Sequence, residues 1–310
     1  MEKEHSPRRA HPPGARFATW AAPDGWGLRR MDWPQTGRKK VRGSLIFASG
    51  RGDFIEKYLE AFAHWHGRGW NVTAFDWRGQ GASQAAGFGF DSFDVLVDDL
   101  AALLADWLAA TSGPHVAIGH SMGGHLLLRT IVERAPALDA AVLVAPMILV
   151  NSAPIPSWLA PDLADTMSRL GFRNTPMWKT PPALQRPGSQ RQKLLTGSRE
   201  RYEDEAWWWE KQPGWNLGAP TWGWARAAYR SAAAAFTPAR LGQVDLPVLL
   251  LGSDRDRLVS PSEIRRVARL LPHAELEMFP VSGHEILREA DPVRRAALAR
   301  IDAFLDGRAK

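Results

Sequence analysis

The stretch that decides the fold is "IGHSMGGHLLLR", residues 118–129. An apolar run, "HVAI", leads into it, and a helical pattern, "HLLLRTIVERA", follows. Its centre, "GHSMG" (119–123), matches Gly-x-Ser-x-Gly, a sharp strand-to-helix turn that exposes a serine hydroxyl above a sheet edge. Glycines flank the serine because larger side chains would collide where strand meets helix. We therefore predict that Ser121 is a nucleophile; the alternative is a glycine-rich turn with an incidental serine.

The composition is that of an ordinary globular protein, with 310 residues, 45% hydrophobic and 23% charged. The absence of cysteine excludes disulfides, thiol catalysis and cysteine metal sites. The net charge is +6, but the arginines are scattered and no nucleic-acid-binding motif occurs, so we expect no nucleic acid partner. Residues 1–15 are polar and lack the apolar stretch of a signal peptide. We expect them to form a disordered lead, and the protein to be cytoplasmic.

Short apolar runs bounded by glycine or proline predict buried strands. They span 43–49, 71–77, 115–120, 140–146, 247–253 and 275–280. Helical patterns lie between them, the clearest at 92–110. This alternation predicts an α/β fold with a mostly parallel sheet covered on both faces. Residues 16–20 and 26–33 are expected to add an antiparallel hairpin at the sheet edge.

The alternation of strands and helices stops within residues 147–240, which hold eight of the fifteen tryptophans. It resumes at Leu246. This pattern is typical of a lobe inserted between two strands of one sheet. We therefore expect residues 16–146 and 241–310 to form the core, and 147–240 to form the inserted lobe.

A serine hydroxyl is a weak nucleophile unless a base takes its proton. In folds with this turn, the acid and then the histidine follow the serine in the chain. His284 comes directly after the last predicted strand and is the candidate base. Asp254 and Asp256 both follow the strand "PVLLLGS". We prefer Asp256, which precedes the apolar return of its loop, and we expect Asp254 to be a turn residue.

A developing oxyanion needs two backbone N–H donors. Met122, the residue after the serine, supplies one in this motif. The second is expected from the loop "ASGRGDFIEKY" after the first central strand. Its glycines let the backbone approach a substrate closely. The donor is expected to be the N–H of Arg51, with Gly52 as the alternative.

With these motifs, the sequence resembles the α/β-hydrolases grouped with bacterial lysophospholipases and monoacylglycerol lipases. The resemblance covers nearly the whole chain after about residue 15. The matching segments are "RGDFIEKYLE" (51–60), "DWRGQGASQ" (76–84), "GHSMGGHLLLR" (119–129), "LLLGSDRDRLVS" (249–260) and "GHEILREADPVR" (283–294), with "RQKLLTGSRERYEDE" and "LGAPTWGWARAAYRS" in the lobe. One departure is Ser49-Gly50, where the family usually has His-Gly before the oxyanion loop.

The resemblance implies that residues 147–240 form a helical cap over Ser121. It also implies a serine hydrolase that cleaves carboxylic esters of lipids through an acyl-enzyme, most similar to a lysophospholipase, without a cofactor or metal. A monoacylglycerol lipase or general carboxylesterase is the nearest alternative. A peptidase is less favoured, because no acidic site for a substrate amine is obvious. Dehalogenases and epoxide hydrolases of this fold use an aspartate nucleophile. The non-enzymatic alternative is a ligand-binding receptor.

The cap suggests how a lipid ester would be recognised. Residues 207–209 are all tryptophan and cannot all point inward on a helix, so we expect Trp207 or Trp208 to face the pocket mouth or a lipid surface. Residues 171–201 are rich in lysine and arginine. Arg191 and Lys193 are therefore candidates to contact a phosphate headgroup or an anionic membrane, the alternative being a solvated basic face. The sequence does not define an oligomeric state.

Overall fold

The computed structural model describes residues 7–36, 41–83 and 92–307. Within this part of the chain, eight strands form one sheet in the order β1-β2-β4-β3-β5-β6-β7-β8. Their bounds are β1 Arg16–Ala21, β2 Gly27–Trp33, β3 Gly43–Ala48, β4 Trp70–Phe75, β5 His115–His120, β6 Ala140–Val144, β7 Val248–Ser253 and β8 Ala274–Phe279. The expected strands are confirmed, with ends that differ by one or two residues.

The sheet is parallel from β4 to β8, and β1 and β2 are antiparallel at one edge. The predicted α/β fold and its edge hairpin are therefore confirmed. In a parallel sheet the carboxyl ends of all strands meet at one edge. The loops after β3, β5, β7 and β8 consequently converge, and these loops carry the predicted site residues.

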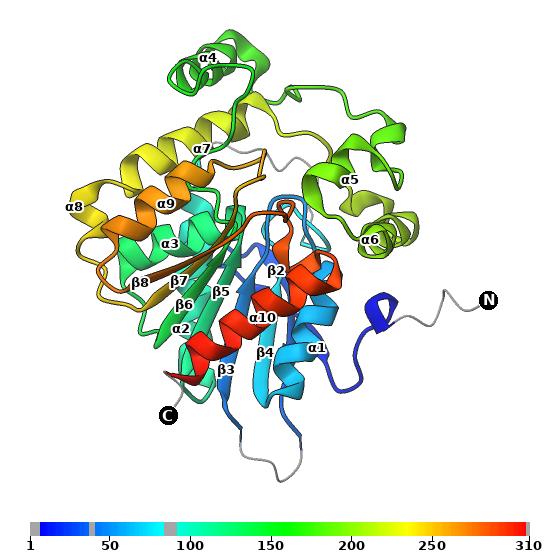
Figure 1. Cartoon of the computed structure of the whole chain (residues 1–310), viewed down its shortest axis with the longest axis vertical. Coiled ribbons are helices and arrows are strands. Elements are labelled where there is room, and N and C mark those ends of the chain that lie inside the picture. Colours follow the sequence, from blue (N-terminus) through cyan, green and yellow to red (C-terminus); the bar gives the residue numbers. More distant parts are fainter. Residues whose placement is uncertain (1–6, 37–40, 84–91, 308–310) are drawn as a thin grey trace.

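Helices cover both faces of the sheet (Figure 1). Helices α1 (Leu59–Gly67) and α10 (Asp291–Asp306) cover one face, and α2 (Asp94–Ala110), α3 (Met122–Arg134) and α9 (Pro261–Leu270) cover the other. Alternate strand residues point to opposite faces: on β3, Phe47 packs with α1, whereas Ile46 packs with α2. Because both faces of the sheet are buried, the sequence of each strand is a continuous run of apolar residues.

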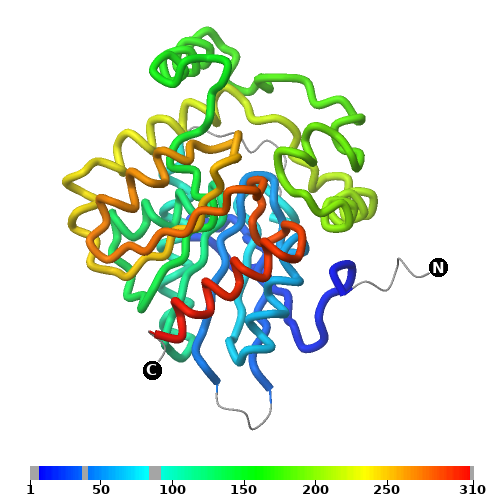
Figure 2. Tube along the Cα trace, viewed as in Figure 1, coloured from blue at the N-terminus to red at the C-terminus, as the bar shows by residue number. Residues whose placement is uncertain are grey.

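The inserted segment lies over the carboxyl edge of the sheet, where Figure 2 shows its trace in green to yellow. It contains α4 (Ala160–Met167), α5 (Gln190–Leu195), α6 (Arg199–Lys211), α7 (Trp222–Ala235) and α8 (Pro238–Leu241). Short 3-10 helices span Pro7–Arg9, Ile55–Tyr58, Pro182–Gln185, Pro213–Trp215 and Ile286–Arg288, and a π-helical turn spans Ser168–Phe172. Helix α7 packs on α3 through a contact of 2.7 Å between His125 Nε2 and Ser231 Oγ. The last part of the inserted segment thus extends the core.

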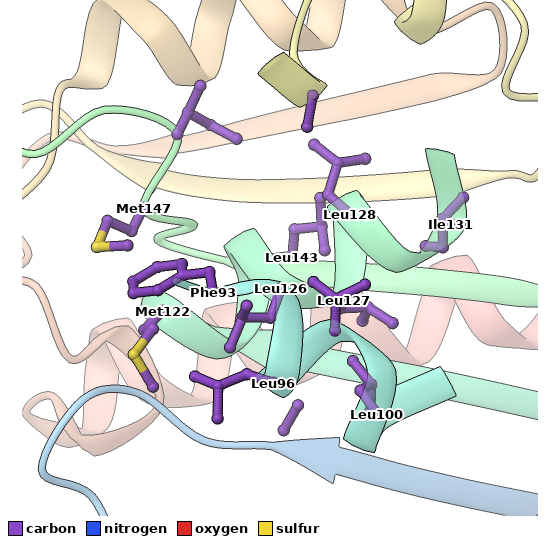
Figure 3. Packing of buried hydrophobic residues seen from close by; sticks show 14 of the residues in the cluster. Phe93, Leu96, Leu100, Met122, Leu126, Leu127, Leu128, Ile131, Leu143 and Met147 are labelled. Carbon is purple, nitrogen blue, oxygen red and sulfur yellow. The ribbon is translucent and has the colours of Figure 1, made fainter. Parts of the chain in front are cut away.

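The start of α3 is anchored in the core. Phe93, Met122 and Met147 gather there beside Leu126 (Figure 3). All four side chains are buried. This packing supports the turn at Ser121 on its core side. The serine therefore lies on a rigid part of the molecule.

Residues 7–15, expected to be a disordered lead, instead pack on the cap and the core. Arg8 and Arg9 both bind the carboxylate of Asp204 on α6. The indole N–H of Trp208 donates to the carbonyl of Arg8 at 3.1 Å, and His11 contacts Glu56. The arginines are therefore ordered by a carboxylate far along the sequence. Residues 1–6 lie outside the described residues.

Within the described ranges, no helix is both long enough and apolar enough to cross a membrane.

Candidate active site

Ser121 occupies a strained turn between β5 and α3, with φ 52° and ψ −117°. Its N–H donates to the carbonyl of Val144 at 3.0 Å, which ties the turn to β6. A Cβ on Gly123 would lie 2.1 Å from the carbonyl oxygen of Ala48. The glycine is therefore required by the close approach of β3. Strain held by its surroundings in this way is typical of functional sites.

The structure brings His284 and Asp256 to Ser121. The Nε2 atom of His284 lies 2.8 Å from Ser121 Oγ, and its Nδ1 atom lies 2.6 Å from Asp256 Oδ2. The other oxygen of Asp256 accepts the N–H groups of Leu258 and Val259 at 2.8 Å and 3.1 Å. Both oxygens of Asp256 are thus engaged. An ionised carboxylate only accepts hydrogen bonds, so this contact favours the tautomer of His284 with the proton on Nδ1.

Asp256 and His284 each stabilise the charged form of the other. Burial works to lower the pKa of His284, but the negative charge and hydrogen bond of Asp256 outweigh it, and the pKa is raised above its ordinary value of 6.5. Burial works to raise the pKa of Asp256, but the charge of His284 and several hydrogen bonds lower it overall. An ionised Asp256 therefore faces an imidazole that readily accepts a proton.

Asp254 is placed differently. Its side chain is 42% exposed and pairs with Arg265 on α9, while Asp256 is buried. Asp256 therefore lies where it can orient His284, and Asp254 does not.

Two backbone N–H groups near Ser121 are not engaged by any residue that the structure describes. They belong to Met122 and Arg51. The neighbouring N–H of Gly50 donates to Asp53 at 2.8 Å, and that of Gly52 donates to Gln80. Gly52, the alternative donor, is therefore already satisfied.

The loop that carries Arg51 runs directly beside the serine. A Cβ on Gly50 would lie 3.1 Å from the Cβ of Ser121. Glycine is needed here for the close approach. Arg51 and Met122 thus keep backbone N–H groups beside Ser121 that have no acceptor among the described residues.

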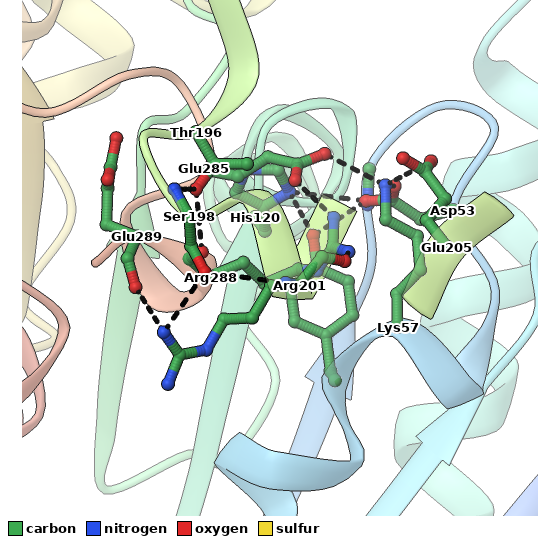
Figure 4. Close-up of polar contacts among 12 residues, drawn as sticks. Asp53, Lys57, His120, Thr196, Ser198, Arg201, Glu205, Glu285, Arg288 and Glu289 are labelled. Carbon is green, nitrogen blue, oxygen red and sulfur yellow. Dashed lines mark hydrogen bonds and ion pairs between the residues drawn. The ribbon is translucent and has the colours of Figure 1, made fainter. Parts of the chain in front are cut away.

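A buried cluster of charges lies beside the site (Figure 4). The ammonium group of Lys57 lies 2.5 Å from Asp53 and 2.9 Å from both Glu205 and Glu285. Three carboxylates this close could suit a metal ion, but the ammonium group contacts all of them. Burial works to lower the pKa of Lys57, but the three carboxylates raise it. Lys57 thus remains charged.

The cluster joins four parts of the molecule. Asp53 accepts the N–H of Gly50 in the loop after β3, and the hydroxyl of Tyr58 lies 2.8 Å from Asp53 and 2.8 Å from His120. Glu285 follows His284, and Glu205 lies on α6 of the cap. Sequence reasoning missed Lys57; the only signal was an acidic residue directly after the candidate histidine.

A cavity of about 420 Å³ opens above Ser121 and His284. Most of its wall is apolar. The apolar lining residues are Met147, Val150, Trp178, Leu184, Leu194, Leu195, Trp209, Leu217, Ala219, Pro220, Trp224, Leu258 and Val259. Most of these side chains come from the cap, so the cap shapes the space that a substrate would fill.

Of the four cap residues singled out from the sequence, one lines the cavity and three do not. Trp208 is buried against Trp215, and neither it nor Trp207 lines the cavity; Trp209 does. Arg191 reaches the cavity wall, but Glu205 binds its guanidinium at two distances of 3.0 Å.

Lys193 is exposed and lies outside the cavity wall. Helix packing separates residues that are neighbours in sequence, because successive side chains point in different directions. A run of tryptophans or of basic residues therefore does not act as a single surface.

The fold and this site define the chain as an α/β-hydrolase. It belongs to the family Hydrolase_4, described as "Serine aminopeptidase, S33", whose model matches residues 39–291. It is 26% identical over 273 residues to a probable lysophospholipase L2 of Haemophilus influenzae, covering 86% of this chain and 84% of that protein. It is 28% identical over 288 residues to lysophospholipase L2 of Escherichia coli, covering 84% and 80%.

The structure is also similar to that of a soluble variant of monoglyceride lipase from Saccharomyces cerevisiae. The TM-score is 0.74 at 17% identity, over 97% of this chain and 98% of the yeast chain. At this identity the likeness concerns the fold alone.

Proposed function

We propose that this protein hydrolyses carboxylic esters of lipids through an acyl-enzyme, with lysophospholipids as the preferred substrates. One observation carries the proposal: a hydrogen-bonded chain from Asp256 through His284 to Ser121 ends in a cavity with mainly apolar walls. A nucleophile, a base and an orienting carboxylate are the parts that acyl transfer requires. An apolar cavity of this size suits an acyl chain.

In the proposed mechanism, Ser121 Oγ attacks the ester carbonyl while His284 Nε2 takes its proton. Asp256 keeps the proton of Nδ1 in place and stabilises the imidazolium. The N–H groups of Met122 and Arg51 donate to the oxyanion. His284 then gives the proton to the leaving alcohol, and a water molecule repeats the sequence to release the fatty acid.

The relatives support a lipid ester over other acyl compounds. Two of the curated relatives are named as lysophospholipases, and the similar yeast structure is named as a monoglyceride lipase. Hydrolysis of a monoacylglycerol remains the second candidate function, because the same cavity would accept its acyl chain.

The family description names an aminopeptidase, which needs an anionic group for the substrate amine. Two carboxylates, Asp53 and Glu285, line the cavity. Both contact the ammonium group of Lys57, and Glu285 also pairs with Arg288. They therefore offer no free charge to an ammonium group, which favours an ester substrate.

We also propose that the cap contacts a membrane surface peripherally, on its cytoplasmic side, and the exposed apolar side chains of the cap support contact with lipid. Trp158 and Leu170 are 76% and 66% exposed, and Trp178, at 53%, also lines the cavity. Exposed apolar side chains clustered on one segment are typical of contact sites for lipid or protein. A lipid substrate would pass from such a surface into the cavity.

A substrate panel tests the proposal. Purified protein and its Ser121→Ala variant are compared on lysophosphatidylcholine, monooleoylglycerol, p-nitrophenyl butyrate and leucine p-nitroanilide. We expect the highest kcat/KM for the lysophospholipid and no release of p-nitroaniline. A preference for the anilide, or equal rates in the Ser121→Ala variant, would contradict the proposal.

A further inference from the structure

Arg51 places a positive charge in the wall of the cavity beside Ser121. Its guanidinium forms no ion pair with any carboxylate in the described part of the chain. Its hydrogen bonds go to the neutral carbonyl oxygens of Gly218 and Ala219, both at 2.9 Å. By contrast, Arg191 and Lys57, the other basic residues of the wall, are neutralised by carboxylates.

The guanidinium of Arg51 is held in one orientation. The two carbonyls lie in the cap loop between α6 and α7, and the ring of Trp224 packs against the group at 5.4 Å from its centroid. A guanidinium has five N–H donors, and these contacts use two. The remaining donors and the charge are free to meet a ligand.

Keeping a cation in such a place is costly. Desolvation disfavours a charge that has no counter-ion nearby, and burial lowers the pKa of Arg51 to about 10. The group is nevertheless protonated at neutral pH. An unneutralised, oriented guanidinium in a substrate cavity is the arrangement that binds a planar or tetrahedral oxyanion such as phosphate.

We propose that the Arg51 side chain binds the phosphodiester of a lysophospholipid headgroup, while the backbone N–H of the same residue donates to the ester oxyanion. This inference rests on the proposed ester hydrolysis. In a lysophospholipid, six covalent bonds separate the ester carbonyl carbon from phosphorus. The backbone N and the guanidinium carbon of an arginine are also six bonds apart, which is the span that the proposal requires.

Arg51 thereby takes the role that the sequence suggested for Arg191 and Lys193. The guanidinium of Arg191 is occupied by Glu205, and Lys193 lies outside the cavity. Selection of an anionic substrate would therefore occur at the reacting centre, next to Ser121, and not on the basic surface of the cap.

A binding experiment tests the site without catalysis. Dodecyl phosphate, dodecanol and inorganic phosphate are titrated by calorimetry into Ser121→Ala and into Ser121→Ala/Arg51→Gln. We expect dodecyl phosphate to bind at least about ten-fold more weakly when Arg51 is replaced, since a hydrogen bond to a charged group is lost. Dodecanol should bind both variants alike. Inorganic phosphate binding as tightly as dodecyl phosphate would overturn the headgroup assignment.

A kinetic experiment tests the same site in the active enzyme. The ratio of kcat/KM for lysophosphatidylcholine to that for monooleoylglycerol is measured for wild type, Arg51→Gln, Arg51→Lys and Lys193→Gln. We expect the ratio to fall at least about ten-fold in Arg51→Gln, to recover in part in Arg51→Lys and to be unchanged in Lys193→Gln.

Thermal melting shows whether each variant keeps its fold. An unchanged ratio in a folded Arg51→Gln, together with equal binding of dodecyl phosphate, overturns the proposal. Failure of every variant and of wild type to cleave any ester would instead refute the proposed function, and would leave the binding result to decide the role of Arg51.

Discussion

His284 Nε2 lies 2.8 Å from Ser121 Oγ, although 163 residues separate the two in sequence. The parallel sheet produces this contact, because it brings the loops after β5 and β8 to one edge. The first prediction follows from it. Ser121→Ala should fold normally and lose ester hydrolysis by on the order of 10⁴–10⁶-fold, since the catalytic residues act as a unit. Circular dichroism and kcat measurements check this, and near-normal turnover would refute the role of Ser121.

Asp256 and Asp254 provide a matched pair of variants on one loop. Asp256→Asn should lower kcat by about 10⁴-fold, because the wrong tautomer of His284 is then favoured. Asp254→Asn removes only an exposed pair with Arg265, which contributes about 0–1 kcal/mol. It should leave kcat nearly unchanged. If Asp254→Asn is the more damaging change, the assignment of the acid is wrong.

The pH profile of the enzyme should report the raised pKa of His284. The base works only when unprotonated, so kcat/KM should rise with pH and level off once the pH exceeds this pKa. Because Asp256 stabilises the imidazolium, the midpoint should lie above the ordinary value of 6.5. The measurement is kcat/KM for a soluble p-nitrophenyl ester. A rate that stays flat from pH 8 to below 6.5 would contradict this account.

Lys57 should contribute to the stability of the folded protein as well as to the position of the loops that it joins. Lys57→Met removes the ammonium group that three buried carboxylates share, while Glu205 and Glu285 keep their ion pairs with Arg191 and Arg288. The loss of this buried charge should lower the free energy of unfolding by about 3–5 kcal/mol. Lys193→Met, at an exposed position, is the control and should change it by less than about 0.5 kcal/mol. Urea denaturation measures both, and equal effects would mean that the cluster contributes nothing.

Variants of Trp208 and Trp209 should distinguish a role in packing the fold from contact with the substrate. Trp208→Ala should destabilise the fold by about 3–5 kcal/mol, because its ring packs between His11 and Trp215. Trp209→Ala should also raise KM for long-chain esters, since Trp209 lines the cavity. KM values for butyryl and palmitoyl esters distinguish the two. A larger change of chain-length preference in Trp208→Ala would reverse the assignment.

The core was predictable because its signals are local. Buried strands appear as short apolar runs, and the turn at Ser121 requires glycines that are visible in the sequence. The chain order of serine, acid and histidine then leaves few candidates for each position. His284 and Asp256 could be chosen because each follows a predicted strand that ends at the same edge of the sheet.

The cap and the charge cluster depend on contacts between distant segments, which the sequence does not reveal. Lys57 contacts Glu285, 228 residues further along the chain. Arg191 is neutralised by a carboxylate on the next helix, and Arg8 binds a residue on α6 that lies 196 positions away. Counting the charged residues that are close in sequence could therefore not predict the ion pair of Arg191. It could not predict that residues 7–15 pack on the fold either. Arg51, by contrast, is left without a described carboxylate partner.

The most direct test of the account is to trap the acyl-enzyme site. The protein is treated with a fluorophosphonate, digested and mapped by mass spectrometry, with His284→Ala and Ser121→Ala as controls. We expect one adduct, on Ser121, that forms slowly in His284→Ala and is absent from Ser121→Ala. No adduct on the folded wild-type protein, or an adduct on another residue, would contradict the assignment of Ser121 as the nucleophile of a lipid ester hydrolase.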